Sequence, residues 1–501
     1  MKRLPRQDLQ EAIDPRPRRW RPIMIVRAAL LASLLAFMIT PIGSAEREIT
    51  VITGATVIDC TGRLPIPDAI VVIEGGKIKA VGRKSEVRPA RGARVIDATG
   101  KYIVPGLIDM HVHYREWQGE LFLASGVTSV KDLGNPIEWV SELSRMQAEG
   151  RLRGPKIFYV GNNLDAPPPE GDHNVGVASA RDSEKAVRLL RGFGVSAIKV
   201  RHKVTVELLR EITKAAHAAG LPVTGHLGVT NAWDAATAGI DGLEHAAGVA
   251  RAAAEAPDEI KIDAKGIKAF IEDLRGFALM SKAREAALIK LMVEKKVKLI
   301  PTLGVRRRAI LEDYSSAILE DDRVAREQAL AYIPERVRKD WSEPALDKMI
   351  RDQISKEDMQ LMREGYRRLE LFVREFRRAG GVVLAGSDNL NGVAGLTLHR
   401  ELESLAAAGL TPMEALIAAT RDAARFLRRE DLGTIEPGKS ADLLILGASP
   451  LDNIRNLSSI KKVFQSGREL DIGFHRDYGL PPARPSLVRP LLLERLLAAE
   501  N

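Results

Sequence analysis

Short apolar runs alternate with longer amphipathic stretches over most of this chain of 501 residues. The apolar runs predict β-strands near residues 103–109, 127–131, 156–160, 195–200, 222–226, 241–245, 297–301 and 381–387. Helical spacing occupies the intervals, as in residues 205–219, which Gly220 follows as a stop signal. Eight alternating units over roughly 300 residues predict an α/β chain folded as a (β/α)8 TIM barrel.

The two ends of the chain carry a different pattern. Residues 47–104 and 432–470 contain short β runs separated by turn glycines. We expect these ends to pair as one small β-sandwich beside the barrel. The predicted domains are a signal peptide or membrane anchor (1–45), a β-sandwich accessory domain (46–104 plus 432–475), the barrel (105–431) and a C-terminal tail (476–501).

Metal-competent side chains lie where the predicted barrel strands end. The first strand ends at His111 and His113, and side chains two apart on a strand point to the same face, as a shared metal ion requires. Such a pair can also be solvated or lie in the core, so the interpretation depends on further ligands. Later strands end at Lys199, His226, His245 and Asp388. In a TIM barrel these ends form the active site.

Several motifs give the chain a family resemblance. They occupy residues 104–113, 126–134, 197–200, 242–245 and 385–388, followed by 398–402, 409–416 and 433–446. The chain resembles the metal-dependent amidohydrolase superfamily, in the branch with a dinuclear centre and a carboxylated lysine, over about residues 48–470. It is most similar to the subgroup of imidazolonepropionase-like proteins and Xaa-Pro dipeptidases.

The resemblance implies a role for each strand-end residue. His111, His113 and Asp388 would hold one metal and His226 and His245 the other. A Lys199 carbamate and a hydroxide would bridge the two metals. An ammonium group cannot ligate a cation, whereas a carbamate formed from CO2 is an anion with two oxygens. We expect two zinc ions, with manganese, cobalt or iron as alternatives for nitrogen and oxygen ligands. Asp388 would also move the proton from the hydroxide to the leaving amine.

The predicted activity is hydrolysis of a linear amide bond in a peptide-like substrate, such as an N-acyl amino acid or a dipeptide. The alternative within enzymes is hydrolysis of a cyclic amide or lactone, as in imidazolonepropionase-like relatives, some of which lack the lysine. A non-catalytic binding protein on the same fold is a third hypothesis, which the retention of all six ligands disfavours.

Candidate substrate-binding residues follow the ligands along the chain. Tyr114 comes directly after the histidine pair, and Arg201 and His202 follow Lys199. A cation there could hold a substrate carboxylate through charge-assisted hydrogen bonds, although solvated loop charges are the simpler interpretation. His399 could face the substrate or cap a helix. The remaining histidines, His173, His217 and His475, are expected in polar loops or on a helix face.

Charge and cysteine content exclude several partners and sites. The formal net charge is +9, and residues 1–45 hold eight basic and three acidic residues, so the charge without them is +4. So small a charge on so long a chain predicts no nucleic-acid partner. Cys60 is the only cysteine, which excludes an intrachain disulfide and a thiolate zinc site.

The N-terminal segment has the pattern of an export signal. Basic residues precede an apolar run over residues 28–39, and residues 43–45 are small, as signal-peptidase cleavage requires. We expect a periplasmic or extracellular protein, with an inner-membrane anchor as the alternative and no other membrane contact. Two long helical connections, residues 246–296 and 304–380, predict a packed lid or the surface of a homo-oligomer.

Overall fold

The computed structural model describes residues 49–88, 92–171, 173–261, 267–310, 315–343, 352–389, 392–485 and 491–499. The predicted signal peptide or anchor, residues 1–45, lies outside these ranges. The residues from Ile49 onward form one compact unit. Within the described ranges, no helix is long and apolar enough to cross a bilayer.

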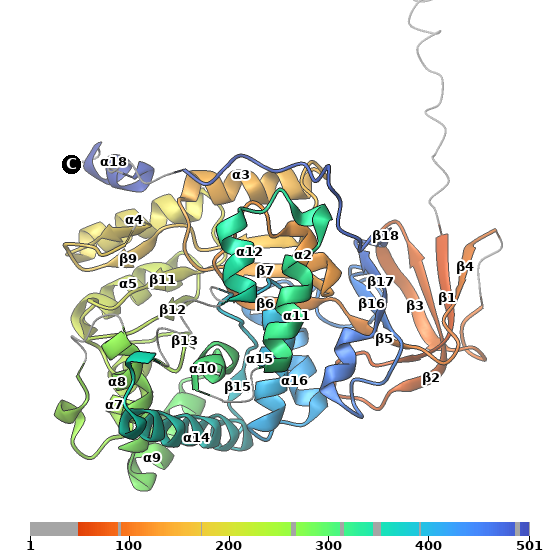
Figure 1. Cartoon of the computed structure of the whole chain (residues 1–501). Helices are drawn as coiled ribbons and strands as arrows, with labels where there is room; N and C mark the ends of the chain where they lie inside the picture. The colour runs from red at the N-terminus through yellow and green to blue at the C-terminus, as the bar shows by residue number, and fades with distance from the viewer. Residues whose placement is uncertain are drawn as a thin grey trace, which may run out of the picture. The chain divides into compact units, whose positions relative to one another are not determined.

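Two parallel sheets carry the strands that the apolar runs predict. The first contains β6 (Leu107–Val112), β7 (Val127–Asp132) and β8 (Lys156–Tyr159). The second has the order β10-β9-β11-β12-β13-β14-β15. Its strands are β9 (Asn163–Asp165), β10 (Asn174–Gly176), β11 (Ile198–Val200), β12 (Val223–Gly225), β13 (Gly242–Glu244), β14 (Lys298–Ile300) and β15 (Val382–Val383). The α/β class is therefore confirmed (Figure 1).

The sequence predicts one closed barrel, but strand pairing does not assign these strands to one. It gives separate sheets of three and seven strands. Backbone hydrogen bonds nevertheless connect the two sheets on both sides. Met110 N donates to Ala385 O at 2.9 Å, and Ser196 N donates to Tyr159 O at 2.8 Å.

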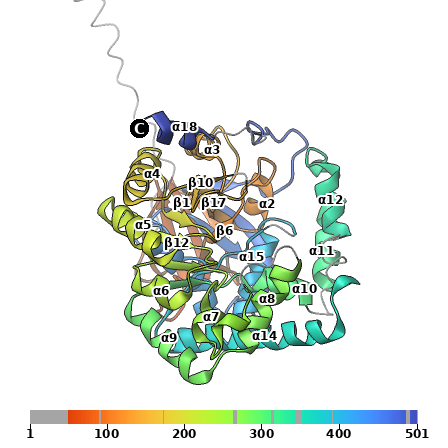
Figure 2. The ribbon, with the colours of Figure 1, turned by 90° about the vertical axis from the view of Figure 1, so that its left-hand side faces the viewer.

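Helices follow most of the parallel strands and surround them in the view of Figure 2. They are α2 (Gly119–Ala124), α3 (Ile137–Ala148), α4 (Ala180–Gly192), α5 (Val206–Ala218), α6 (Ala232–Thr237), α15 (Leu396–Ala407), α16 (Pro412–Ala418) and α17 (Arg421–Phe426). Helix α5 matches its prediction closely: Thr205 caps it by accepting a hydrogen bond from Leu208 N. Gly220 then supplies a left-handed φ of +74°.

The two chain ends share one mixed sheet, as predicted, but the β-sandwich is not confirmed. All eight strands pair in a single sheet in which β16 bonds to β5. The strands are β1 (Ile49–Val57), β2 (Ile66–Glu74), β3 (Lys77–Arg83), β4 (Arg94–Asp97), β5 (Tyr102–Pro105), β16 (Leu443–Leu446), β17 (Ile460–Gln465) and β18 (Arg468–Leu470). The predicted strand 103–109 is divided between β5 and β6 at Gly106, where an added Cβ would lie 2.3 Å from the hydroxyl of Thr128.

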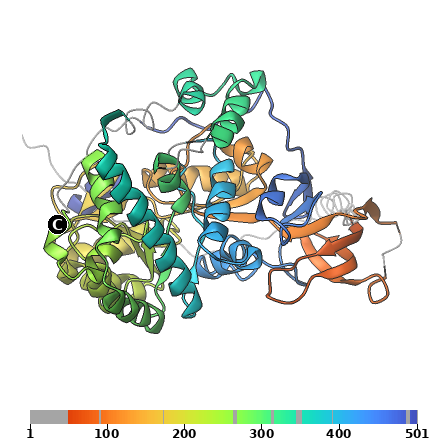
Figure 3. The same ribbon diagram turned by 60° about the horizontal axis from the view of Figure 1, so that its bottom comes forward.

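The two long connections are helical, as predicted. They contain α7 (Val249–Ala253), α8 (Ile267–Ala278), α9 (Lys282–Glu294), α10 (Leu303–Ile310), α11 (Ser315–Ala325), α12 (Glu335–Ser342) and α14 (Lys356–Arg378). Helix α14, the long teal helix of Figure 3, packs against α8. An added Cβ on Gly365 would lie 1.8 Å from Leu274 O, so this close approach requires glycine. The connections therefore pack onto the domain.

The C-terminal tail also packs onto the domain. Trp139 Nε1 on α3 donates to Pro482 O at 2.8 Å. Helix α18 (Leu492–Ala499) contacts α3, α4 and β10, and its Leu493 is fully buried. Figure 1 shows the tail passing along α3 before α18.

Candidate metal centre

The ends of the parallel strands bring the predicted ligands to one level. His111 lies on β6 and Lys199 on β11, while His226 and His245 directly follow β12 and β13. Backbone bonds between neighbouring segments keep these ends aligned. His226 N donates to Val200 O at 3.1 Å, His245 N to Ile300 O at 2.7 Å, and Asp388 N to His111 O at 2.8 Å.

Asp388 lies at the centre of the histidine cluster. Its Oδ1 is 3.7 Å from His111 Nε2 and 3.6 Å from His113 Nε2, and its Oδ2 is 3.9 Å from His245 Nδ1. Ligand atoms of His111, His245 and Asp388 lie within 4.8 Å of one another, which suits a metal ion. The His226 ring is 4.3 Å from that of His245. Which ligands share which metal stays a prediction.

Burial favours the neutral form of three imidazoles in the cluster. It holds the pKa values of His113, His226 and His245 well below the usual range, and neighbouring histidines lower them further. A neutral imidazole has a lone pair to give to a cation. Burial therefore favours the form of these three imidazoles that can bind a metal.

Lys199 is buried among these groups, with 1% of its surface exposed. Its Nζ has no hydrogen-bond partner within the described residues. Burial lowers its pKa to about 7, against the opposing charge of Glu244. Near neutral pH a large share of this amine is uncharged, which is the form that reacts with CO2.

Asp388 adds a second buried atom without a partner. Its Oδ1 accepts no hydrogen bond from any described group. Its backbone is left-handed, with φ +45°, as are those of His245 at +60° and Thr302 at +49°. Such strain in non-glycine residues clusters at functional sites. The neutral imidazoles, the unpaired carboxylate oxygen and the unpaired amine together fit divalent cations.

Glu244 holds His111 in place through a hydrogen bond, a role that the sequence reasoning missed. It accepts hydrogen bonds from His111 Nδ1 at 2.8 Å, Lys131 Nζ at 3.2 Å and Thr224 Oγ1 at 2.6 Å. The bond to Nδ1 leaves Nε2 of His111 facing Asp388. Burial alone would raise the pKa of Glu244, but the charge of Lys131 and the hydrogen bond from His111 hold it well below the usual range. Its place beside His245 in residues 242–245 was the available signal.

Asp109 joins the first and last strand ends. Its carboxylate accepts hydrogen bonds from His111 N at 3.1 Å, from Ser387 N at 2.9 Å and from Ser387 Oγ at 2.6 Å. Burial raises its pKa to about 7. Asp109 therefore fixes the backbone next to two predicted ligands.

The four predicted substrate-binding residues differ in position. The His202 ring is 4.3 Å from that of His226, and burial lowers the pKa of His202 to about 4. The Arg201 guanidinium lies close enough to Asp388 to interact electrostatically with it, and burial lowers the Arg201 pKa. Tyr114 is fully buried and stacks on Phe122, with ring centroids 5.9 Å apart. His399 is buried too, and its Nε2 donates to Ser125 O at 2.9 Å. Their roles in substrate binding stay predictions.

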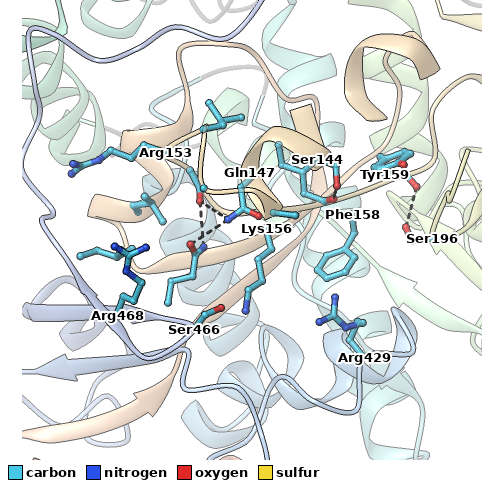
Figure 4. A pocket seen from close by; sticks show the side chains of 18 of the residues that line it. Ser144, Gln147, Arg153, Lys156, Phe158, Tyr159, Ser196, Arg429, Ser466 and Arg468 are labelled. Atoms are coloured by element: carbon cyan, nitrogen blue, oxygen red, sulfur yellow. Dashed lines mark hydrogen bonds between the residues drawn. The ribbon is translucent and has the colours of Figure 1, made fainter. Parts of the chain in front are cut away.

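A hollow of about 720 Å³ lies away from all predicted ligands (Figure 4). Its lining includes Lys156, the first residue of β8, and Ser196, which precedes β11. The hollow therefore lies at the end of the sheets where the parallel strands begin. Residues of β17 and β18 complete its wall. The polar groups here bond to one another, as between Gln147 Nε2 and Gln465 Oε1 at 3.2 Å. The hollow is a junction between the terminal sheet and the parallel strands.

Comparison with known proteins gives a family and a fold. The Amidohydrolase family profile matches residues 102–470. An imidazolonepropionase from Pyrobaculum arsenaticum is 68% identical over 37 residues, only 7% of this chain and 9% of that protein. A Xaa-Pro dipeptidase with bound methionine is 19% identical, covering 85% of this chain and 100% of that one, with a TM-score of 0.61. A bottromycin amidohydrolase is 22% identical, covering 88% and 93%, with a TM-score of 0.62. At these identities the structural likeness concerns the fold.

Proposed function

The chain belongs to the amidohydrolase family, and from that premise we propose that it is a dinuclear metal-dependent hydrolase of linear, peptide-like amide bonds. As a member it is a hydrolytic enzyme that acts on amide C–N bonds. The number of metals, the substrate type and the residue roles are the proposal. The observation that carries it is the buried, unpaired Lys199 amine, which lies close enough to His113, His226, His245 and Asp388 to interact with them electrostatically.

We further propose that the parallel strands close into a (β/α)8 barrel. The backbone bonds from Met110 to Ala385 and from Ser196 to Tyr159 support closure, since they join β6 to the segment after β15 and β8 to the segment before β11. A closed ring would surround the ligands with strand ends, as in TIM-barrel enzymes.

The proposed ligands divide into two groups. His111, His113 and Asp388 would hold one cation and His226 and His245 the other, with a Lys199 carbamate between them. Two divalent cations, which we expect to be Zn²⁺, would activate a water molecule and polarise the scissile carbonyl. The neutral Lys199 amine would attack the carbon of CO2, forming an N–C bond while a C=O electron pair moves to oxygen and one amine proton leaves. This product supplies the anionic oxygens that an ammonium lacks.

Asp388 is the proposed proton carrier. Its unpaired Oδ1 is an acceptor at the centre of the cluster. It would take a proton from the attacking water and give it to the leaving amine nitrogen, so that the C–N bond breaks to a neutral amine.

Arg201 favours a substrate with a carboxylate. Its Nε is buried and has no hydrogen-bond partner within the described residues, and burial lowers its pKa. A buried N–H without an acceptor is costly, and a substrate carboxylate would supply the acceptor to this Nε in addition to the charges of Asp165 and Asp388 that act on the guanidinium. N-acyl amino acids and dipeptides carry that group. His202, Tyr114 and His399 remain weaker candidates for substrate contact.

A substrate screen tests the proposed function. Protein reconstituted with Zn²⁺ and bicarbonate would be assayed against N-acyl amino acids, dipeptides including Xaa-Pro, cyclic amides and lactones, with metal content measured in parallel. We expect two metals per chain and cleavage of linear amides. Activity confined to lactones or cyclic amides would favour the alternative hydrolase. Bound metal with no activity on any of them would favour a binding protein.

Replacement of Asp388 by asparagine tests its proton role. We expect kcat to fall by roughly 10²–10⁴-fold, the usual contribution of general acid–base catalysis, while KM changes much less. Steady-state kinetics, normalised to bound metal, would measure both. Equal losses in turnover and substrate binding would contradict the shuttle.

A further inference from the structure

The residue after Asp388 carries an amide whose two ends have different surroundings. Asn389 Oδ1 accepts a hydrogen bond from the backbone N–H of His113 at 2.9 Å. Because that N–H can only donate, the oxygen must face it, and the NH2 group is fixed on the other side. Nδ2 is buried and has no hydrogen-bond partner within the described residues.

This unpaired donor calls for an explanation. Asn389 is 4% exposed, so the solvent cannot compensate its NH2 group freely. Buried polar groups in native structures are nearly always hydrogen-bonded, and exceptions often belong to binding or catalytic sites. The donor is therefore suited to an acceptor atom that a ligand supplies.

Asn389 is tied directly to two predicted metal ligands. The peptide bond connects it to Asp388, and the hydrogen bond connects it to His113. Asp388 and His113 themselves approach to 3.6 Å. The Asn389 amide is therefore anchored to the same short segments that present the reacting centre.

Charge indicates that Asn389 and Arg201 would contact different groups of the substrate. The Asn389 amide is neutral and cannot offset the repulsion between a substrate carboxylate and Asp388, whereas Arg201, which also lies near Asp388, supplies a positive charge. Arg201 follows β11, which β12, β13 and β14 separate from β15 in the sheet order. A substrate spanning the site could thus place its carboxylate at Arg201 and its carbonyl at Asn389.

We propose that Asn389 Nδ2 donates a hydrogen bond to the scissile carbonyl oxygen of the substrate. This assignment rests on the proposed amide hydrolysis. The oxygen gains negative charge when water adds to the carbonyl carbon, so the hydrogen bond strengthens in the transition state and acts mainly on kcat.

Two variants separate the donor from the structural role of Asn389. Asn389→Asp keeps an oxygen for the His113 N–H but replaces the NH2 group, whereas Asn389→Ala removes both. Gln465→Glu is the matched control: it makes the same change to an amide that donates to Thr128 O and Gly154 O in the distant hollow. All kinetics would be normalised to bound metal.

We expect both Asn389 variants to lose about 10²–10³-fold in kcat, the typical effect of removing one oxyanion donor. Gln465→Glu should stay close to wild type. The loss should be the same for a free-acid substrate and its C-terminal amide, whereas Arg201→Met should discriminate between them through KM. A loss in Asn389→Ala alone would assign the residue only to holding His113 and would overturn the proposal.

Binding provides a readout independent of turnover. A phosphonate analogue of an N-acyl amino acid, titrated calorimetrically, presents tetrahedral oxygens like those of the transition state. We expect both variants to bind it at least about tenfold more weakly than wild type while binding the product carboxylate normally. Unchanged analogue binding in both variants would overturn the proposal. A wild-type protein that cleaves no amide refutes the proposed function, and the titration then still decides whether Asn389 binds such an oxygen.

Discussion

The metal centre and the hollow of Figure 4 both contain lysine and amide side chains, whose nitrogen atoms are hydrogen-bonded at the hollow, whereas those of Lys199 and Asn389 at the metal centre are unpaired in the described part of the chain. In the hollow, Lys156 pairs with Asp442 at 2.7 Å and also donates to Ser440 Oγ. At the metal centre, Lys199 Nζ, Asp388 Oδ1 and Asn389 Nδ2 are buried without partners within the described residues. The hollow has a volume of about 720 Å³, whereas the metal centre has buried polar atoms without hydrogen-bond partners among the described residues. For this reason the proposed function rests on the unpaired buried groups and not on the volume of the hollow.

Left-handed backbone occurs in both regions but is more concentrated at the metal centre, since of the residues that line the hollow Ser466, with φ +49°, is the one non-glycine residue with a positive φ. His245, Thr302 and Asp388 adopt left-handed φ angles next to one another in the metal centre, where His245 Nδ1 and the Thr302 hydroxyl lie 2.8 Å apart. Strain of this kind persists only when the surroundings enforce it. The network of Asp109 and Glu244 supplies such enforcement, through its bonds to His111 and Ser387.

The largest effect should follow replacement of Lys199 by methionine. This change keeps the volume but removes the amine that the proposed carbamate needs. We expect loss of bound metal and a fall in kcat/KM of about 10³-fold or more, because metal-derived stabilisation amounts to several kcal/mol. Elemental analysis and kinetics would measure both. Lys156→Met makes the same change in the hollow and should keep its metal. Full metal content and activity in Lys199→Met would refute the comparison.

The next effect concerns the pair between Lys131 and Glu244. Both side chains are fully buried. Glu244→Gln would leave the Lys131 charge unpaired, so we expect a loss of roughly 3–5 kcal/mol in unfolding free energy. We also expect metal affinity to fall about 10–100-fold, since Glu244 orients His111. Chemical denaturation and metal titration would test these values.

A double variant sharpens this test. Removing the charge of Lys131 as well, in Lys131→Met with Glu244→Gln, should restore much of the stability. It should not restore the metal affinity, because His111 would still lack its carboxylate. Recovery of both would mean that Glu244 acts only through charge balance.

The corresponding pair in the hollow should affect stability alone. Lys156 and Asp442 retain 17% and 6% side-chain exposure. Asp442 also accepts hydrogen bonds from Ser466 N at 2.8 Å and Ser440 Oγ at 2.8 Å, so it keeps partners when Lys156 is removed. We expect Lys156→Met to cost about 1–2 kcal/mol, between the values for exposed and buried pairs. A large loss of kcat/KM in the folded variant would link the hollow to catalysis.

The sequence predicts the parallel strands well because each lies in an apolar run, and several of these runs end at a polar residue that could bind a metal. His226, for example, follows β12 directly. Strands β9 (Asn-Leu-Asp) and β10 (Asn-Val-Gly) each contain a single large apolar residue, so they form no apolar run that the sequence reasoning could detect. The contact of Lys131 with Glu244 joins β7 to β13, and only the strand arrangement brings these side chains together. The pairing of the terminal strands depends on register between distant segments, which is why their pattern suggested a sandwich whereas the strands pair in one sheet.

The smallest predicted effect concerns a third group of paired charges, in which His475 lies between Glu120 of α2 and Asp471. His475 Nδ1 lies 2.7 Å from Glu120 Oε1, and its Nε2 lies 3.0 Å from Asp471 Oδ2. Arg153 Nε also pairs with Glu120 at 3.1 Å, and the Tyr332 hydroxyl donates to Glu120 at 3.3 Å. The hydrogen bonds to Glu120 and Asp471 raise the pKa of His475.

A raised folded-state pKa means that His475 stabilises the fold most below its unfolded pKa, about 6.5. The contribution disappears as the pH rises through the folded-state value. We therefore expect His475→Gln to lower Tm by about 1–2 °C near pH 6 and by less near pH 9. His217→Gln is the reference, since His217 has one carboxylate partner, Asp241, at 2.8 Å. Thermal unfolding across this range would decide the sign. A loss of Tm that grows with pH would contradict the pairing. An unchanged kcat/KM in His475→Gln would assign this charge group to structure, as for the hollow. Catalysis would then depend on the unpaired groups at the strand ends.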